Sequence, residues 1–303
     1  MGLRDVSSVE EVVEELSSRN YLADRGLATA VFLSLRQNRP LLLEGEAGVG
    51  KTELAKSLSD WAQGDLIRLQ CYEGIDSNQA VYEWDYARQL LHLRTAEASG
   101  RTQDLSSDTL EGELYDERFL IKRPLLRALS VKNDPPPVLL IDEIDRADDE
   151  FEAFLLEILS EYAITIPELG TYSSEIKPIV VITSNRTRDL HDALKRRCFY
   201  HWVEHPDVER EVEIIRIRAP EVSLLLAEEV AKAAAFLRGM DLYKPPGVAE
   251  TIDWAEALVT IGVDDLDKDS VDETLGTLIK YREDQERIRS RGFDEILSLV
   301  RQG

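Results

Sequence analysis

The chain has 303 residues, of which 43% are hydrophobic and 31% charged, a composition that supports a packed core and excludes wholesale disorder. It carries 36 Lys and Arg against 59 Asp and Glu, and the resulting net charge of −23 argues against sequence-independent binding of nucleic acid. Two cysteines exclude a disulfide framework, and with no readable signal peptide or long apolar run we expect a cytoplasmic protein without a membrane span.

The first part of the chain alternates between helical and strand patterns. Ser8 and Glu11 have the spacing of a capping box at the start of a helical pattern, and a glycine-rich loop follows the first apolar run. In chain order, we predict helices over 8–36, a strand over 41–43, a loop over 45–50, a helix over 53–62, a strand over 66–69, an amphipathic stretch over 80–93 and a polar loop over 95–113.

The second part begins with the same alternation and then becomes helical. Strands this apolar, separated by helices, predict a parallel sheet covered by helices on both faces. From residue 207 onward nearly every segment has a helical period, so we predict an α/β domain over 1–206 and a smaller all-helical domain over 207–303. The individual predictions are a strand over 138–142, a helix over 150–162, a hairpin around Gly170 and a strand over 179–185.

A phosphate-binding motif, G-x-x-x-x-G-K-[ST], follows the first predicted strand. Its glycines allow successive backbone N–H groups to converge on phosphate oxygens, and the next helix points its positive end at the same anion. Lys51 is expected to neutralise the β- and γ-phosphates, and the Thr52 hydroxyl to bind Mg²⁺. The motif consists of Gly45, Glu46, Ala47, Gly48, Val49, Gly50, Lys51 and Thr52.

Two adjacent carboxylates, Asp142 and Glu143, end the apolar strand 138–142. Buried charge of this kind needs a cation or a polar ligand to neutralise it. Asp142 at the strand tip is placed to reach Mg²⁺, and Glu143 to orient or deprotonate a water that attacks the γ-phosphate.

Further polar side chains follow the strand 179–185. Asn185 at its end is suited to holding the attacking water or sensing the γ-phosphate, although a plain turn residue is the alternative. Arg196 and Arg197 are suited to stabilising transition-state charge on the nucleotide of a neighbouring subunit, and a solvated basic patch is the alternative for them.

The order GEAGVGKT, VLLIDEID, VVITSN, ALKRRC and a helical C-terminal region resembles the AAA+ ATPase fold, a P-loop core with a helical lid. The stretches CYEGIDSNQAVYEWDYARQLLHLR and RPLLRAL are similar to MoxR-type AAA+ proteins, especially the branch associated with carbon monoxide dehydrogenase maturation. The resemblance implies that Lys51 and Thr52 are the Walker A pair and Asp142 and Glu143 the Walker B pair. It further implies that Asn185 is sensor 1 and that Arg196 or Arg197 is the finger acting on the next subunit.

The sensor 2 position departs from the family pattern. Where the family has a small residue followed by Pro-Arg at the start of a lid helix, this chain has Lys244-Pro245-Pro246-Gly247-Val248-Ala249-Glu250. A glutamate does not neutralise a γ-phosphate, so either Lys244 substitutes for the arginine or the lid lacks this role.

The resemblance also implies partners. It suggests ATP and Mg²⁺ bound between the subunits of a hexameric ring, a partner protein with a von Willebrand A domain, and a metalloenzyme client. Tyr82 or Trp84 lies where such rings place a pore-facing loop that grips a client, and packing into the core or a subunit interface is the alternative.

Two apparent metal patterns are rejected. Cys198, His201 and His205 lack a fourth zinc ligand nearby. The run Asp265, Asp267 and Asp269 lacks the glycine and the final glutamate of a calcium loop, and an acidic helix N-terminus explains it better.

Three functions therefore remain. The first is an ATP-driven remodelling chaperone that matures a metalloenzyme active site. The second is a nucleic-acid motor or the nucleotide-hydrolysing subunit of a restriction complex, against which the net charge of −23 speaks. The third is a nucleotide-switched scaffold with little turnover, which the missing sensor 2 arginine favours. The chain has no N-K-x-D motif for reading guanine, which favours ATP.

Overall fold

A computed structural model describes residues 3–98, 112–132 and 135–300. Its centre is a five-stranded sheet in the order β2-β5-β8-β1-β9, and every neighbouring pair is parallel. This confirms the predicted parallel sheet and adds β9, a strand that the sequence analysis did not anticipate. The strands are β1 (Leu41–Gly45), β2 (Leu66–Gln70), β5 (Val138–Asp142), β8 (Ile179–Ser184) and β9 (Phe199–Val203).

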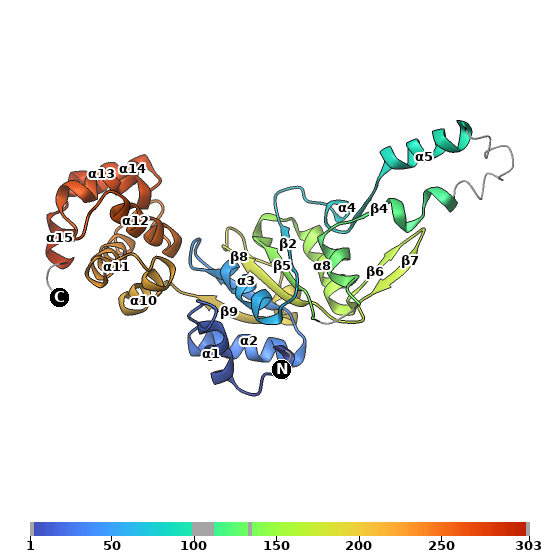
Figure 1. Ribbon diagram of the computed structural model, residues 1–303, viewed down its shortest axis with the longest axis horizontal. Helices are drawn as coiled ribbons and strands as arrows, with labels where there is room; N and C mark the ends of the chain where they lie inside the picture. The colour runs from blue at the N-terminus through green and yellow to red at the C-terminus, as the bar shows by residue number, and fades with distance from the viewer. Residues whose placement is uncertain (1–2, 99–111, 133–134, 301–303) are drawn as a thin grey trace.

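Helices cover both faces of this sheet (Figure 1). Successive residues of the central strands point to opposite faces, so that Leu42 and Ile141 join one hydrophobic cluster while Leu43 and Leu140 join the other. Because both faces are buried, the strands are continuously apolar, as the sequence indicated. One cluster includes α1 (Val9–Ser17), α2 (Arg25–Gln37) and α3 (Lys51–Ala62), and the other α7 (Pro124–Leu129), α8 (Asp149–Glu161) and α9 (Asp192–Arg197).

Two small hairpins extend this core. The predicted hairpin around Gly170 is present, but the predicted amphipathic stretch over 80–93 is interrupted by a strand, because Tyr82–Trp84 pairs antiparallel with Leu120–Lys122. Helix α5 projects away from the body (Figure 1) and continues through residues 95–98 of the predicted polar loop, whereas 99–111 lie outside the described residues. The bounds are α4 (Ser77–Ala80), β3 (Tyr82–Trp84), α5 (Tyr86–Ala98), β4 (Leu120–Lys122), β6 (Ala163–Ile166) and β7 (Gly170–Ser173), with 3₁₀ turns η1 (Leu3–Asp5), η3 (Glu117–Phe119) and η4 (Ile144–Arg146).

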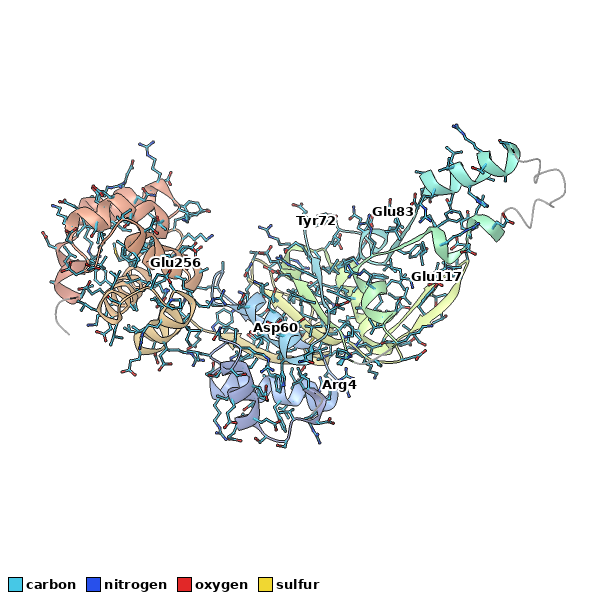
Figure 2. All side chains as sticks on the ribbon, viewed as in Figure 1. Arg4, Asp60, Tyr72, Glu83, Glu117 and Glu256 are labelled. Carbon is cyan, nitrogen blue, oxygen red and sulfur yellow. The ribbon has the colours of Figure 1, made fainter. Side chains whose placement is uncertain are left out.

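The C-terminal region is helical, as predicted, and has its own hydrophobic cluster around the fully buried Trp254. In Figure 2, Glu256 marks these helices, Arg4 the N-terminal helices, and Glu83 and Glu117 the side from which α5 extends. The helices are α10 (Val208–Arg218), α11 (Leu224–Arg238), α12 (Val248–Thr260), α13 (Lys268–Leu278), α14 (Arg282–Arg291) and α15 (Asp294–Val300).

The start of α12 is fixed by a buried ion pair. Arg238 donates two hydrogen bonds to the carboxylate of Glu211, at 2.7 and 2.6 Å, and Glu211 is fully buried. The same guanidinium also donates to the Pro246 carbonyl at 2.8 Å and to the Thr251 hydroxyl at 3.1 Å. One side chain therefore sets the position of the turn that begins α12.

We expect Arg238→Ala to lower the free energy of unfolding by about 3–5 kcal/mol, because it leaves the Glu211 carboxylate buried without a partner. Chemical denaturation measures this. Arg282→Ala, which removes an ion pair to Glu286 at the surface, is the matched control and should change stability little. Equal effects of the two substitutions would contradict the role assigned to Arg238.

Candidate active site

The phosphate-binding motif joins the end of β1 to the start of α3. Gly48 and Gly50 have φ angles of +81° and +90°, a backbone conformation that favours glycine. Gly50 is the N-cap of α3, so the positive end of that helix faces the loop. The local geometry is therefore that of an anion-binding loop.

The Lys51 side chain folds back onto this loop. Its Nζ donates to the carbonyl oxygens of Gly45 at 2.9 Å and Glu46 at 2.6 Å, and the residue is only 6% exposed. Burial lowers the pKa of Lys51 to about 8, although the nearby carboxylates of Asp145 and Asp142 oppose this change. An arriving phosphate has to replace the two carbonyl oxygens as the partner of this amine.

Asp142 ends β5 and is 3% exposed. Its Oδ1 accepts hydrogen bonds from the Thr52 hydroxyl at 3.1 Å and from the Thr183 hydroxyl at 2.5 Å. Its Oδ2 accepts one from Arg68 of β2 at 2.5 Å, so a guanidinium neutralises the carboxylate. The carboxylate and the Thr52 hydroxyl are hard oxygen donors of the kind that Mg²⁺ prefers, so these residues fit the ion.

Glu143 follows with a left-handed backbone, φ 55°. Its two carboxylate oxygens accept hydrogen bonds from Gln70 Nε2 at 3.0 Å and Asn185 Nδ2 at 3.2 Å, and Arg146 lies 3.4 Å away. The structure therefore brings the predicted pair Glu143 and Asn185 together. It also adds Gln70, which sequence reasoning missed because its role depends on β2 lying beside β5.

A third acid, Asp145, ties the end of β8 to the same site. It is buried and accepts hydrogen bonds from the backbone N–H groups of Asn185 at 3.1 Å and Thr187 at 2.9 Å, and from the Thr187 hydroxyl at 2.7 Å. Burial alone would raise the pKa of Asp145, but these hydrogen bonds outweigh it and hold the pKa below its usual range. Its place two residues after Glu143 is the signal that could have revealed it.

Arg196 and Arg197 lie away from this site. They end α9 just before β9, whose first residue, Phe199, pairs with Leu41 at the amino-terminal end of β1. The structure therefore places both arginines at the sheet edge opposite the phosphate-binding loop of their own chain. Both are exposed, and Arg197 donates to the Leu156 carbonyl at 2.8 Å, whereas the Arg196 side chain has no hydrogen bond or ion pair with a described residue.

The C-terminal helices touch the loop through α12. The Val248 N–H donates to the Gly48 carbonyl at 3.0 Å, while Glu250 turns back to accept from the Gly247 N–H at 3.1 Å. Lys244 is exposed and does not line the adjacent cavity. That cavity has a volume of about 260 Å³ and lies between the N-terminal segment, the loop and the C-terminal helices. The described residues that line it are 20–22, 48–50, 52, 53, 214, 218, 248, 249 and 252.

Arg218 is the cation that the C-terminal helices contribute to this cavity. Its Nη1 lies 2.5 Å from the Glu53 carboxylate on α3, so an ion pair joins α10 to the helix that follows the phosphate-binding loop. Sequence reasoning missed Arg218, and its position in the last turn of α10 gave no indication of this contact.

The two aromatic candidates for gripping a client differ in exposure. Trp84 is 7% exposed and packs edge-on against Tyr115 and Tyr82, with ring centroids 5.2 and 6.3 Å apart. This contradicts a client-gripping role for Trp84 and favours the alternative, packing into the core. Tyr82 is partly buried and lines a surface cavity of about 620 Å³.

The residues of the rejected metal patterns have other contacts. The His205 ring lies 3.0 Å from the Glu46 carboxylate, and Asp267 caps α13 by accepting from the Ser270 N–H at 2.7 Å, which confirms the acidic helix start. No group of three or more His, Cys, Asp or Glu in the described part of the chain is placed to hold a metal ion. None of the described helices is long and apolar enough to cross a membrane.

Comparison with known proteins gives one family match. A family model described as AAA domain (dynein-related subfamily) matches residues 40–198, slightly more than half of the chain. Among solved structures, the chain is similar to the Thermotoga maritima RuvB Holliday junction branch migration motor, with 18% identity over 90% of this chain and 72% of that one and a TM-score of 0.45. A point mutant of the same Thermotoga maritima protein matches at 19% identity over 90% of this chain and 71% of that one, with a TM-score of 0.46. No curated protein matches.

The first prediction of this site concerns pH. Because Lys51 has a pKa lowered to about 8, it loses its charge as the pH rises through that value, and the charged form is the one that binds phosphate. The affinity for a nucleotide should therefore fall about tenfold between pH 7 and pH 9, with uptake of about half a proton at pH 8. Calorimetry in buffers of different ionisation enthalpy measures both quantities. Lys56→Met, five residues further along α3, should retain this dependence, and an affinity that stays constant over this range would refute it.

A second prediction concerns the contact between α12 and the loop. A Cβ at Gly247 would lie 2.9 Å from both the Ala47 carbonyl oxygen and Gly48 Cα, so Gly247→Ala must push α12 away and break the hydrogen bond from Val248 to Gly48. Losing a contact of about 1 kcal/mol should weaken nucleotide binding about fivefold. In the control Gly276→Ala the nearest atom to the new Cβ is 3.7 Å away, so binding should not change. Unaltered binding in Gly247→Ala would show that the contact is dispensable.

Proposed function

The chain belongs to the dynein-related subfamily of AAA domains, and we propose that it is a Mg²⁺-dependent ATP hydrolase with a nucleotide-binding domain over 1–206 and a helical lid over 207–303. One observation carries the proposal. At the carboxyl-terminal edge of adjacent parallel strands, an anion-binding loop lies beside two hydrogen-bonded pairs, Thr52 with Asp142 and Asn185 with Glu143. These residues are Lys51, Thr52, Asp142, Glu143 and Asn185.

In this proposal the loop binds the phosphates and the neighbouring cavity holds the base. Gly45, Glu46, Ala47, Gly48, Val49 and Gly50 supply backbone N–H groups, and Lys51 exchanges its carbonyl partners for phosphate oxygens. Asp142 and the Thr52 hydroxyl hold Mg²⁺, which supplies neutralising charge to the β- and γ-phosphates. The cavity between residues 20–22 and the lid accommodates the adenine.

Glu143 is the base in this mechanism. Its carboxylate accepts a proton from the attacking water, and Asn185, already 3.2 Å from it, orients that water toward the γ-phosphate. Gln70 holds the other carboxylate oxygen and keeps the side chain at the sheet edge. The hydrogen bonds that Gln70 and Asn185 each donate to Glu143 support a water-activating role.

We further propose that the active form is a ring, hexameric in the related proteins, in which each Arg196 stabilises transition-state charge on the nucleotide of the next subunit. Two observations support this. The arginines lie at the sheet edge opposite their own loop, where a head-to-tail neighbour would present its nucleotide. Arg196 has no competing hydrogen bond within the described residues, whereas Arg197 is already bound to Leu156, which favours Arg196 as the finger.

The biological role we propose is that of a MoxR-type remodelling chaperone. It rests on the resemblance of the 71–94 and 123–129 stretches to the branch associated with carbon monoxide dehydrogenase, whose members act with a von Willebrand A domain partner on a metalloenzyme client. The net charge of −23 supports a protein client over nucleic acid.

The catalytic proposal predicts that Glu143→Gln retains ATP binding and loses hydrolysis by at least about a hundredfold, since the base is gone and the loop is intact. Lys51→Ala should lose binding itself. Steady-state hydrolysis of ATP and GTP and the affinity for a labelled nucleotide measure the two effects. Glu150→Gln, an exposed acid at the start of α8, is the control. Hydrolysis by Glu143→Gln at the wild-type rate would contradict the assignment of the base.

The chaperone proposal has a separate test. The wild-type chain with ATP should restore activity to the apo form of a molybdenum- and copper-containing carbon monoxide dehydrogenase, and Glu143→Gln should not. Hydrolysis stimulated by duplex DNA in a salt-sensitive manner, with no effect on this client, would favour a nucleic-acid motor instead.

A further inference from the structure

Arg39 joins two parts of the fold through its hydrogen bonds, and the catalytic proposal gives it no role. It occupies the connection between α2 and β1, three residues after Arg36 and directly before Pro40. Its backbone is fixed to the end of α2, because its N–H donates to the Ser34 carbonyl at 3.2 Å and its own carbonyl accepts from the Ser34 hydroxyl at 2.7 Å. The side chain therefore starts from a well-defined point.

The guanidinium of Arg39 reaches across to the end of α9. Its Nη2 donates to the Arg196 carbonyl at 2.8 Å and its Nε to the Arg197 carbonyl at 3.2 Å, and it stacks 4.8 Å from the centre of the Phe199 ring. The last carbonyls of a helix lack intrahelical partners and carry partial negative charge, so a guanidinium is well suited to bind them. A planar fork makes both contacts at once, which a lysine amine does not.

The surroundings of this contact are cationic. A cavity of about 390 Å³ is lined by Arg39, Lys177, Arg196 and Arg197, and no acidic residue is among its described lining residues. In a chain with a net charge of −23, four neighbouring cations without a carboxylate repel one another and do not stabilise the fold by ion pairing. Such a cluster is complementary to an anion on another molecule.

We infer that Arg39 is a positioning residue for the finger: it holds the end of α9 so that Arg196 is presented to the nucleotide of the next subunit. This inference rests on the ring and the finger proposed above. It also connects two sites through one strand, because Arg39 lies two residues before the first residue of β1 and the phosphate-binding loop begins at its last residue. In this inference, the loop after β1 binds the nucleotide of its own subunit, and Arg39 before β1 positions the finger for the nucleotide of the next subunit.

The experiment combines subunits with different defects. Arg39→Gln alone should reduce the hydrolysis rate about ten- to a hundredfold, the cost of misplacing a reacting group by about 1 Å, with nucleotide affinity unchanged. When Arg39→Gln subunits are mixed with Lys51→Ala subunits, the hydrolysis rate of the mixture should be well above the average of the rates of the two variants measured separately. Lys51→Ala subunits cannot hydrolyse ATP, but they lend an intact finger to the intact loop of Arg39→Gln. Arg39→Lys should behave like Arg39→Gln, and Arg36→Gln, exposed in the last turn of α2, should behave like the wild type.

Each other outcome overturns the inference in a recognisable way. If Lys51→Ala subunits restore the hydrolysis rate of Arg196→Ala but not that of Arg39→Gln, Arg39 does not act through the finger. The same conclusion follows if Arg39→Gln loses nucleotide affinity in proportion to its loss of hydrolysis rate. If Arg196→Ala and Arg197→Ala both hydrolyse ATP at the wild-type rate, it is the proposed finger itself that fails.

Discussion

The buried carboxylate of Asp142 is the constraint on which the site depends. A carboxylate with 3% exposure at the end of an apolar strand is costly unless it is hydrogen-bonded and neutralised. Here the hydroxyls of Thr52 and Thr183 and the guanidinium of Arg68 meet this need, and they come from α3, β8 and β2. Satisfying one charge therefore fixes the helix after the loop and both neighbours of β5 in a single arrangement.

The same arrangement orients the side chains of Glu143 and Asn185 at the edge of the sheet. Glu143 leaves the strand with a left-handed backbone that turns its side chain toward Gln70 and Asn185, while Asp145 binds the backbone that carries Asn185. Strand β1 then links this edge to the opposite one, where Arg39 holds the end of α9. The phosphate-binding loop at one edge of the sheet and the end of α9 at the other are thus connected through β1.

Much of this was predictable from the sequence, for identifiable reasons. The central strands are buried on both faces, so their apolar runs mark them, and the glycines and Lys51 of the loop have a spacing that few other structures need. The three-residue strand at Tyr82 was not predictable, because it depends on pairing with Lys122, far along the chain. Gln70 and Arg218 were missed for a similar reason: each acquires its contact only when distant segments lie side by side. Trp84 shows the converse, an aromatic residue whose place in the sequence suggested a surface role but which packs in the core.

The most direct test of the account is the specific ATP hydrolysis rate measured against subunit concentration, together with the mass of the protein in solution at each concentration. If each site is completed by the next subunit, the rate per subunit should rise with concentration in parallel with the assembled fraction and reach a plateau when assembly is complete. A rate per subunit that is constant while the mass changes from monomer to oligomer would contradict the account, because each chain would then contain a complete site.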